Sequence, residues 1–356
     1  MRWRRTSATC RARSARGRGD EVSTCATVPG SALRQGYATH PDLRKPGDQR
    51  KRSQIAGFRH RRRIATQWHL RKRSICAILA QLRARVVPVT EPSFTALTAA
   101  AARAAHLIVD AEPRIFTDEL AAPLLGDYGD QLLAYHRDHR EDPILAGGRT
   151  QVLCRSRYAE AQRATQSVVL GAGLDTSAYR APHTHVFEVD LPRTQEWKLA
   201  QLTNADLPEP ANRTFVPLDL ATGDLVEALV KHGFDLARPT LVSWLGVTMY
   251  LTEAAITRTL RAVAGLAPGT QLVADYVLPA QLRDDAGAHY ADAVSQVAER
   301  AGEPWRSHFS PGELTDLLRD NGFGTVRHVH QRDHDVWPRP DALRPAELFV
   351  LAHATV

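Results

Sequence analysis

The fold of this 356-residue chain is decided by the stretch Ser167-Val168-Val169-Leu170-Gly171-Ala172-Gly173-Leu174-Asp175. A short apolar run, 167–170, reads as a strand, and two glycines follow it almost at once. Glycine permits positive φ and lets the backbone approach a ligand closely. In open α/β sheets, ligands bind at the carboxyl ends of the strands. We therefore expect a nucleotide site where this strand ends.

Strand-like and helix-like segments alternate from this point to the C-terminus. Further strands are expected at 185–190, 214–218, 239–244, 270–277, 325–329 and 347–352. Helices are expected at 192–202, 223–232, 253–266 and 310–321, with Thr252 as the N-cap of the third. Apolar strands alternating with helices imply a mostly parallel sheet that is covered on both faces. The pattern predicts an α/β, Rossmann-like sheet of seven strands.

The residues before the first strand read as helical. We expect helices at 93–109 with Ser93 as N-cap, and at 119–125, 131–139 and 150–163. No strand-like sequence interrupts this region. The chain thus places a helical segment in front of an α/β core of about 165–356.

Charge is divided unevenly along the chain. Residues 1–90 contain 22 Lys and Arg but four acids, whereas residues 91–356 contain 24 Lys and Arg and 35 acids. Little apolar periodicity and much like charge predict that residues 1–90 are disordered, or are not a natural part of the mature protein. The alternative is a basic arm that contacts the phosphates of nucleic acid or anionic lipid. We expect residues 91–356 to form the folded domain.

Two classes of protein are excluded by composition. No stretch approaches the roughly 18 unbroken apolar residues of a membrane helix. The four cysteines form no CxxC pair and have no zinc-finger spacing, so neither a disulfide framework nor a structural metal is expected. This use of cysteine is typical of a cytoplasmic protein. Without an apolar stretch of that length, no membrane partner is expected.

Acidic residues follow the next two strands. Glu188 and Asp190 lie 15 and 17 residues beyond Gly173, a distance that suits a carboxylate bonded to ribose hydroxyls. Asp219 follows the third strand, where it can accept a hydrogen bond from an adenine amino group, with Leu220 beside it. Together these residues predict a nucleoside site.

The residues after the second glycine indicate which nucleotide binds. A dinucleotide fingerprint requires a third glycine where Thr176 stands. Asp175 would oppose a pyrophosphate at a helix N-terminus, but it would favour the cationic aminoacyl and sulfonium end of S-adenosylmethionine. The charge argument therefore favours S-adenosylmethionine over NAD.

Across about residues 93–353 the chain also resembles the bacterial methyltransferases of the leucine carboxyl methyltransferase family, many of them actinobacterial. The blocks that carry this resemblance are 169–176, 187–192 with Lys198, 217–220, 249–251, and 309–314 with 322–323. The resemblance implies a class I methyltransferase fold with a helical lid, here about 93–163. It also implies that Arg155 binds the cofactor carboxylate and that Gly171, with Ala172 and Gly173, lines the aminoacyl pocket. Asp190 would hold the ribose, and Asp219-Leu220 would hold the adenine.

One departure from the family bears on the acceptor. The family commonly has Glu-Gly before its Met-Tyr-Leu block, whereas Leu245-Gly246 stand here. The role that this glutamate has in the family therefore cannot be assigned to position 245. A leucine carboxylate as the methyl acceptor cannot be assumed either. The expected partner is a small-molecule methyl acceptor, and nucleic acid is expected only if the basic 1–90 segment is a real arm.

Methyl transfer demands alignment, exclusion of water and, for a hydroxyl acceptor, removal of a proton. A carboxylate acceptor needs no base. Tyr250, His136 and His308 are conceivable bases, with Tyr250 expected as a pocket wall and the two histidines at the surface. The leading hypothesis is an O-methyltransferase for a carboxylate or hydroxyl. The alternatives are an NAD(P)-dependent oxidoreductase and a catalytically silent nucleotide-binding protein.

Overall fold

The computed structural model describes residues 94–300 and 302–356. The predictions for residues 1–90, and Ser93 as a helix N-cap, lie outside the described residues. Within the described ranges, no helix combines the length and apolar character needed to cross a membrane.

A seven-stranded sheet forms the centre of this part of the chain, in the order β3-β2-β1-β4-β5-β7-β6. The strands are β1 (Gln166–Leu170), β2 (His185–Asp190), β3 (Arg213–Pro217), β4 (Leu241–Trp244), β5 (Gln271–Val277), β6 (Thr325–Val329) and β7 (Phe349–Thr355). Only β7 runs antiparallel to its neighbours, β5 and β6. The predicted mostly parallel, seven-stranded sheet is confirmed, with β7 displaced toward the C-terminus by two to three residues.

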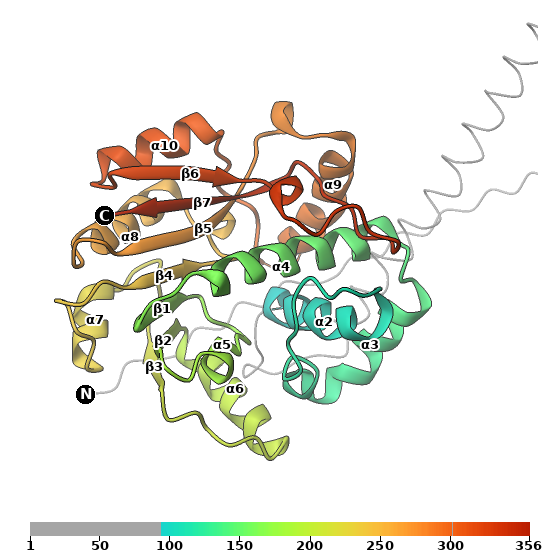
Figure 1. Cartoon of the computed structure of the whole chain (residues 1–356), viewed down its shortest axis with the longest axis horizontal. Coiled ribbons are helices and arrows are strands. Elements are labelled where there is room, and N and C mark those ends of the chain that lie inside the picture. Colours follow the sequence, from blue (N-terminus) through green and yellow to red (C-terminus); the bar gives the residue numbers. More distant parts are fainter. Residues whose placement is uncertain (1–93, 301) are drawn as a thin grey trace, which may run out of the picture. The chain divides into compact units, whose positions relative to one another are not determined.

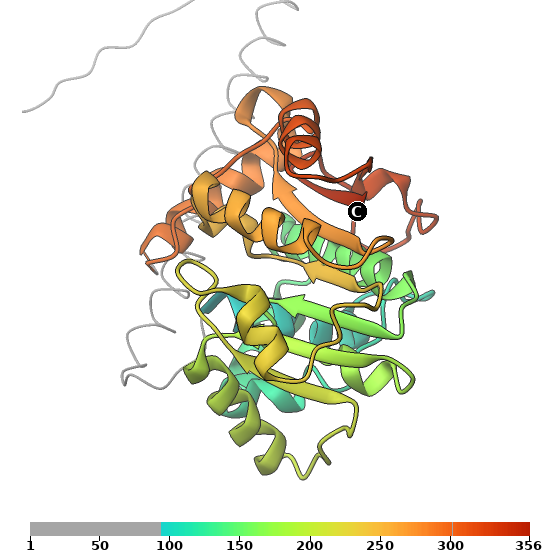
Figure 2. The same ribbon diagram turned by 90° about the vertical axis from the view of Figure 1, so that its left-hand side faces the viewer.

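Helices cover both faces of the sheet. Leu229 of α7 (Leu225–Lys231), Leu260 of α8 (Glu253–Ala264) and Leu318 of α10 (Pro311–Asp320) join the largest apolar core on one face. Ala159 of α4 (Pro143–Ala161) packs on the opposite face against β4, β5 and β7. Figure 1 shows α4 crossing in front of the strands, and Figure 2 shows α7 and α8 side by side.

Two helix starts follow from their capping residues. Thr252 Oγ1 accepts from Ala255 N at 3.3 Å, as predicted for α8. Ser310 and Glu313 form a reciprocal capping box at the start of α10, which stabilises both backbone donors. Local sequence therefore sets where these two helices begin.

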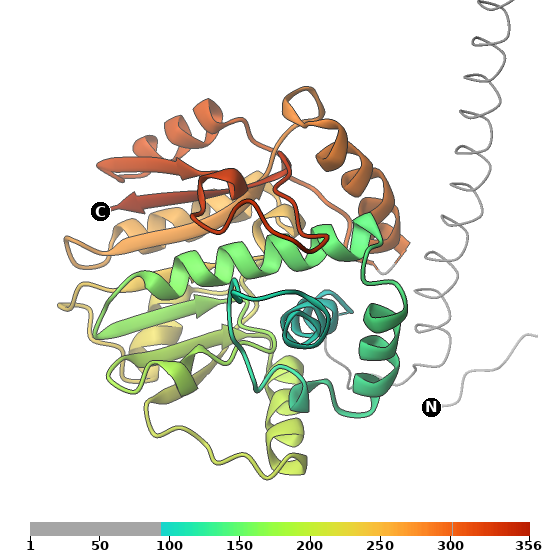
Figure 3. The same cartoon turned by 45° about the vertical axis from the view of Figure 1, so that its right-hand side comes forward.

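A group of helices lies off the carboxyl ends of the parallel strands (Figure 1). It comprises α2 (Phe94–Val109), α3 (Gly129–Asp138), the first half of α4, and α9 (Asp285–Arg300). Figure 3 looks along α2, which packs against α3 and α4. We did not predict α9. The elements that complete the described chain are α5 (Ser177–Arg180), α6 (Pro192–Asn204), η1 (Pro123–Tyr128), η2 (Thr248–Tyr250), η3 (Ala280–Leu282) and η4 (Gln331–Asp333).

The helix predicted at 119–125 is wrong. The structure has a turn there, followed by η1, which Pro123 begins. Proline lacks the N–H that a continuing helix requires. Gly126, at φ 53°, then breaks the helical backbone. The apolar residues of this segment are buried without helical periodicity.

Candidate cofactor and active site

The loop after β1 folds back over the end of β2. Gly171 N donates to Val189 O at 2.8 Å. Gly173 N donates to Asp190 Oδ2 at 2.6 Å, and Leu191 N donates to Asp190 Oδ1 at 2.7 Å. The two glycines have φ values of 66° and 49°, which residues with a Cβ rarely adopt. The shape of this loop depends on glycine at both positions and on one carboxylate.

A cavity of about 470 Å³ opens beside this loop. Its wall includes eight of the nine predicted cofactor residues: Arg155, Gly171, Ala172, Gly173, Asp175, Asp190, Asp219 and Leu220. They meet because parallel strands end at one edge, with Leu170 beside Val189 and Asp190 beside Pro217. Sheet register thus joins residues that lie far apart in the sequence.

Arg155 reaches the cavity from α4. Its Nη1 donates to Asp275 Oδ2 at 2.8 Å, and Gly246 N donates to Asp275 Oδ1 at 2.6 Å. At Gly246, with φ 76°, a Cβ would lie 2.6 Å from the Arg155 guanidinium. Leu245 lines the cavity where the family has an acid. A buried acid on β5 therefore holds Arg155 without help from position 245.

Two further carboxylates are fixed by their own loops. Asp175 Oδ1 accepts from Ser177 N at 2.8 Å, and Asp219 Oδ1 accepts from Ala221 N at 2.8 Å. Such bonds are typical of Asx turns. These bonds hold both carboxylates in place at the cavity wall.

Glu188 does not line the cavity, and its predicted cofactor role needs correction. Its side chain is 1% exposed and accepts from Lys198 Nζ at 2.5 Å. Glu188 lies two residues inside β2, opposite Val169, whereas Asp190 ends the strand. Glu188 and Lys198 form a buried ion pair beneath the site.

Neither Tyr250 nor His308 suits the role of base. Tyr250 lines the cavity, as predicted, but burial raises the pKa of its phenol. The phenol stays protonated at neutral pH, so it can donate a hydrogen bond but cannot take a proton from an acceptor. His308 is exposed, as predicted for a surface residue.

His136 was predicted at the surface, which is wrong. It is 7% exposed and lines the cavity. Its Nδ1 lies 3.1 Å from Arg149 Nη1, and because a guanidinium only donates, Nδ1 accepts. The ring proton is therefore on Nε2, so neither nitrogen can take a proton from an acceptor.

The burial of His136 predicts a pH dependence of stability. Desolvation, then the charge of Arg149, lowers the pKa of His136 from 6.5 to about 4. Between these values the unfolded chain binds a proton that the folded chain does not, so stability is full above pH 6.5 and falls as pH decreases. We expect His136 to account for a loss of about 2 kcal/mol between about pH 7 and about pH 5. Urea denaturation should show a smaller loss in His136→Gln. Equal losses in both proteins would contradict the assignment.

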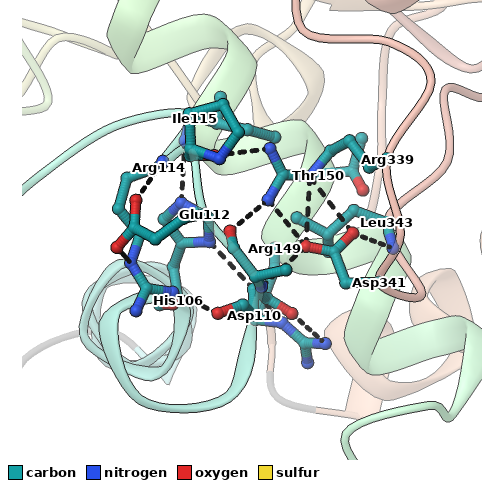
Figure 4. Close-up of polar contacts among 12 residues, drawn as sticks. His106, Asp110, Glu112, Arg114, Ile115, Arg149, Thr150, Arg339, Asp341 and Leu343 are labelled. Carbon is teal, nitrogen blue, oxygen red and sulfur yellow. Dashed lines mark hydrogen bonds and ion pairs between the residues drawn. The ribbon is translucent and has the colours of Figure 1, made fainter.

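A buried polar cluster fixes the helices over the cavity (Figure 4). Arg149 donates from Nε and Nη2 to the two oxygens of Asp110, at 2.9 and 3.0 Å. Asp110 also bonds to His106 Nδ1 at 2.9 Å. Ala111 N donates to Asp341 Oδ2 at 2.9 Å, which ties the cluster to the C-terminal segment. The cluster joins α2 and α4 to residues near the end of the chain.

Sequence reasoning missed this cluster, Asp275 and the whole of α9. The spacing of His106 and Asp110 on one helix face is a signal for a local pair. Arg149 and Asp275 gave no such signal, since a lone charged residue predicts solvent exposure. Their partners come from distant parts of the chain.

The cavity wall fits S-adenosylmethionine chemically. Asp190 and Asp219 provide acceptors for hydroxyl and amino groups, and Arg155 provides a cation for a carboxylate. The apolar side chains of Leu191 and Leu220 line the same part of the cavity and suit a purine face. A pyrophosphate would meet the carboxylate of Asp175 instead of a cation.

The chain is similar to several known proteins. Residues 96–264 match the model of the family described as leucine carboxyl methyltransferase. YktD of Bacillus subtilis, provisionally named an S-adenosyl-L-methionine-dependent methyltransferase, is 29% identical over 74% of this chain and 98% of its own. A Mycobacterium tuberculosis protein with the same provisional description is 34% identical over 59% of this chain and 70% of its own. A crystal structure of a provisionally named methyltransferase from Thermobifida fusca is 17% identical over 75% of this chain and 96% of that one, with a TM-score of 0.48.

The names of these sequence relatives share one chemistry, methyl transfer from S-adenosylmethionine. They do not favour the alternatives of an NAD(P)-dependent oxidoreductase or a silent nucleotide-binding protein. S-adenosylmethionine is accordingly the cofactor, and the seven-stranded sheet has the class I methyltransferase topology. The chain belongs to the leucine carboxyl methyltransferase family and is an S-adenosylmethionine-dependent methyltransferase.

Proposed function

We propose that the enzyme methylates an oxygen of a small organic molecule. One observation carries the proposal: the cavity beside the glycine loop continues beneath α2, α3, α4 and α9. Apolar side chains such as Ile144, Val152 and Val297 line that continuation. Ligand sites that are mostly apolar with a few placed polar groups suit small molecules.

The site residues have the following proposed roles. Arg155 binds the cofactor carboxylate, Gly171 to Gly173 and Asp175 surround its aminoacyl and sulfonium end, Asp190 holds the ribose, and Asp219 and Leu220 hold the adenine. When bound, S-adenosylmethionine supplies an electrophilic methyl group on a positive sulfur. The chain's own contribution is to orient the acceptor and to exclude water. Neither task requires a metal ligand.

We also propose that residues of about 93–163 act as the lid and that 165–356 form the cofactor-binding core. Arg103 of α2 supports a close link between the two parts. It donates from Nη2 to Leu174 O at 2.6 Å, and from Nε to Asp118 Oδ2 at 2.7 Å. The lid is thus bonded directly to the glycine loop. Residues 1–90 are proposed to lie outside the catalytic domain.

Two glycines in the middle of α4 make room for an aromatic wall of the cavity. A Cβ at Gly147 would lie 2.9 Å from Tyr290 Cδ2, and a Cβ at Gly148 would lie 3.3 Å from the Tyr290 hydroxyl. Glycine inside a helix costs about 1 kcal/mol relative to alanine. Its presence at both positions supports a packing role for the Tyr290 ring.

We expect Gly147→Ala to lower the free energy of unfolding by about 1–3 kcal/mol, because the new methyl overpacks against Tyr290. It should also weaken acceptor binding by moving that ring. Gly312→Ala in α10 is the matched control, since a Cβ there has no neighbour within 4 Å. Denaturant titration of both variants checks this. If Gly147→Ala and Gly312→Ala raised the free energy of unfolding equally, Tyr290 would be shown to move freely.

The proposed function is tested on the full chain. S-adenosylmethionine binding is measured by calorimetry, and formation of S-adenosylhomocysteine is followed with a panel of small hydroxyl and carboxyl compounds. Micromolar binding with turnover of panel members supports the proposal. Binding without turnover of any small molecule, but with methylation of a protein or peptide, would overturn it.

A further inference from the structure

One end of the cavity, within reach of Arg155, is built by the segment that follows α9. Gly302, at φ 83°, ends the helix and turns the chain back. Arg306 N then donates to Met249 O at 2.6 Å, and Ser307 Oγ donates to Thr248 O at 2.9 Å. These bonds fix residues 303–309 against η2. Glu303 and Trp305 consequently face the same cavity as Tyr250.

Aromatic rings make the walls of this end. Tyr290 and Trp305 both contact Phe349 edge to face, with ring centroids 6.1 and 5.7 Å apart and interplanar angles of 83° and 78°. All three side chains line the cavity. Rings held in such mutual contact offer rigid, flat surfaces. The walls suit a planar apolar framework.

A carboxylate, Glu303, belongs to this end of the cavity. Glu303 is half-buried and lines the cavity. Burial is the largest cause that raises the pKa of Tyr250, and the negative charge of Glu303 is the second. The Glu303 carboxylate therefore lies near that phenol. An acceptor that enters between these aromatic rings therefore meets a carboxylate and a protonated phenol.

The arginines that line the cavity are paired with acids or lie near the proposed cofactor site. Among the described lining residues, Arg103 pairs with Asp118 at 2.7 Å and Arg149 with Asp110 at 2.9 Å. Arg155 pairs with Asp275 at 2.8 Å, and its free side is already assigned to the cofactor carboxylate. Arg193 follows β2, beside Asp190 at the cofactor end. His136 is neutral at neutral pH, because burial lowers its pKa to about 4. An acceptor carboxylate would face Glu303 with no available cation.

We propose that the acceptor presents a hydroxyl group on an aromatic framework, a phenol, and that Glu303 takes its proton. This inference rests on the proposed O-methyl transfer. The acceptor oxygen forms a bond to the methyl carbon as the carbon–sulfur bond breaks, and that electron pair stays on sulfur. The hydroxyl proton passes to the Glu303 carboxylate and then to water. The tyrosine at position 250 donates a hydrogen bond that orients the acceptor.

The test uses two probes of the same shape, naphthol and naphthoate, with the full chain. Wild type should methylate naphthol, and Glu303→Gln should lower kcat/KM for it by about 100-fold or more. The phenol para-nitrophenol is already ionised in the assay buffer and needs no base. Glu303→Gln should therefore lower kcat/KM for para-nitrophenol only slightly. Glu299→Gln, the same change on the exposed side of α9, should leave both rates unchanged.

Binding gives a second readout that does not depend on turnover. In calorimetry with the cofactor product present, Glu303→Gln should bind naphthoate about tenfold more tightly, since a like charge is removed. S-adenosylmethionine affinity should not change. Two results would overturn the role of Glu303 and leave O-methylation standing. One is that wild type methylates naphthoate in preference to naphthol. The other is that Glu303→Gln lowers kcat/KM equally for both phenols. Normal cofactor binding without turnover of either probe would count against the proposed function itself.

Discussion

Replacing Arg149 by alanine is expected to lower the free energy of unfolding by about 3–5 kcal/mol. The Arg149 side chain is fully buried, and it donates two hydrogen bonds to Asp110 and a third to Arg140 O at 2.6 Å. Without the guanidinium, Asp110 is a buried carboxylate whose remaining side-chain partner is the imidazole of His106. Urea denaturation with a tryptophan signal measures the loss. Asp110→Asn, which leaves Arg149 unpaired, should destabilise in the same range.

The control for this prediction lies on the same helix. Arg157 pairs with Asp335 at 3.0 Å, but the two side chains are 40% and 83% exposed. Pairs in water contribute about 0–1 kcal/mol, so Arg157→Ala should have a small effect. Similar losses in Arg149→Ala and Arg157→Ala would mean that the buried cluster does not hold the lid. A larger loss only at Arg149 would identify that cluster as the main polar support of α2 and α4.

Replacing Asp190 by alanine is expected to weaken S-adenosylmethionine binding by about 100-fold or more. The carboxylate accepts from two backbone donors, Gly173 N and Leu191 N, and also faces the cavity. Each hydrogen bond to a charged group contributes about 1.5–3 kcal/mol, and loss of both would let the glycine loop leave its binding geometry. Burial raises the pKa of Asp190, so the affinity that calorimetry measures should fall as the pH is lowered.

Glu188→Gln is the informative comparison for Asp190→Ala. Both acids belong to β2, but Glu188 pairs with Lys198 and does not line the cavity. We expect Glu188→Gln to reduce stability while the folded protein binds S-adenosylmethionine with nearly unchanged affinity. A loss of affinity at Glu188 equal to that at Asp190 would restore the sequence-based prediction that both residues contact the ribose. Thermal denaturation separates loss of folding from loss of binding.

The meeting of Gly171, Gly173, Asp190 and Asp219 at one cavity could be predicted from sequence because these residues are set by local patterns. An apolar run followed by Gly171 and Gly173, and carboxylates directly after two further strands, define the ends of parallel strands. Such ends meet at one edge in any sheet of this topology. Local capping residues, such as Ser310 and Thr252, fixed two helix starts for the same reason. The prediction failed for Glu188 because a spacing along the chain cannot distinguish the last residue of a strand from one just inside it.

The sequence by itself thus determined the α/β class, the seven mostly parallel strands, and the nucleoside chemistry of the loop after β1. Only the tertiary structure decided which charges are buried and with whom: Arg155 with Asp275, and Arg149 with Asp110. It also decided the end of the cavity where Glu303 and the rings around Tyr290 meet residues of η2 and β7, which we propose holds the acceptor. The physical reason is sequence separation. Strand and helix periodicity is set by neighbouring residues, whereas the partners of these buried charges are chosen by packing between elements 39 and 120 residues apart.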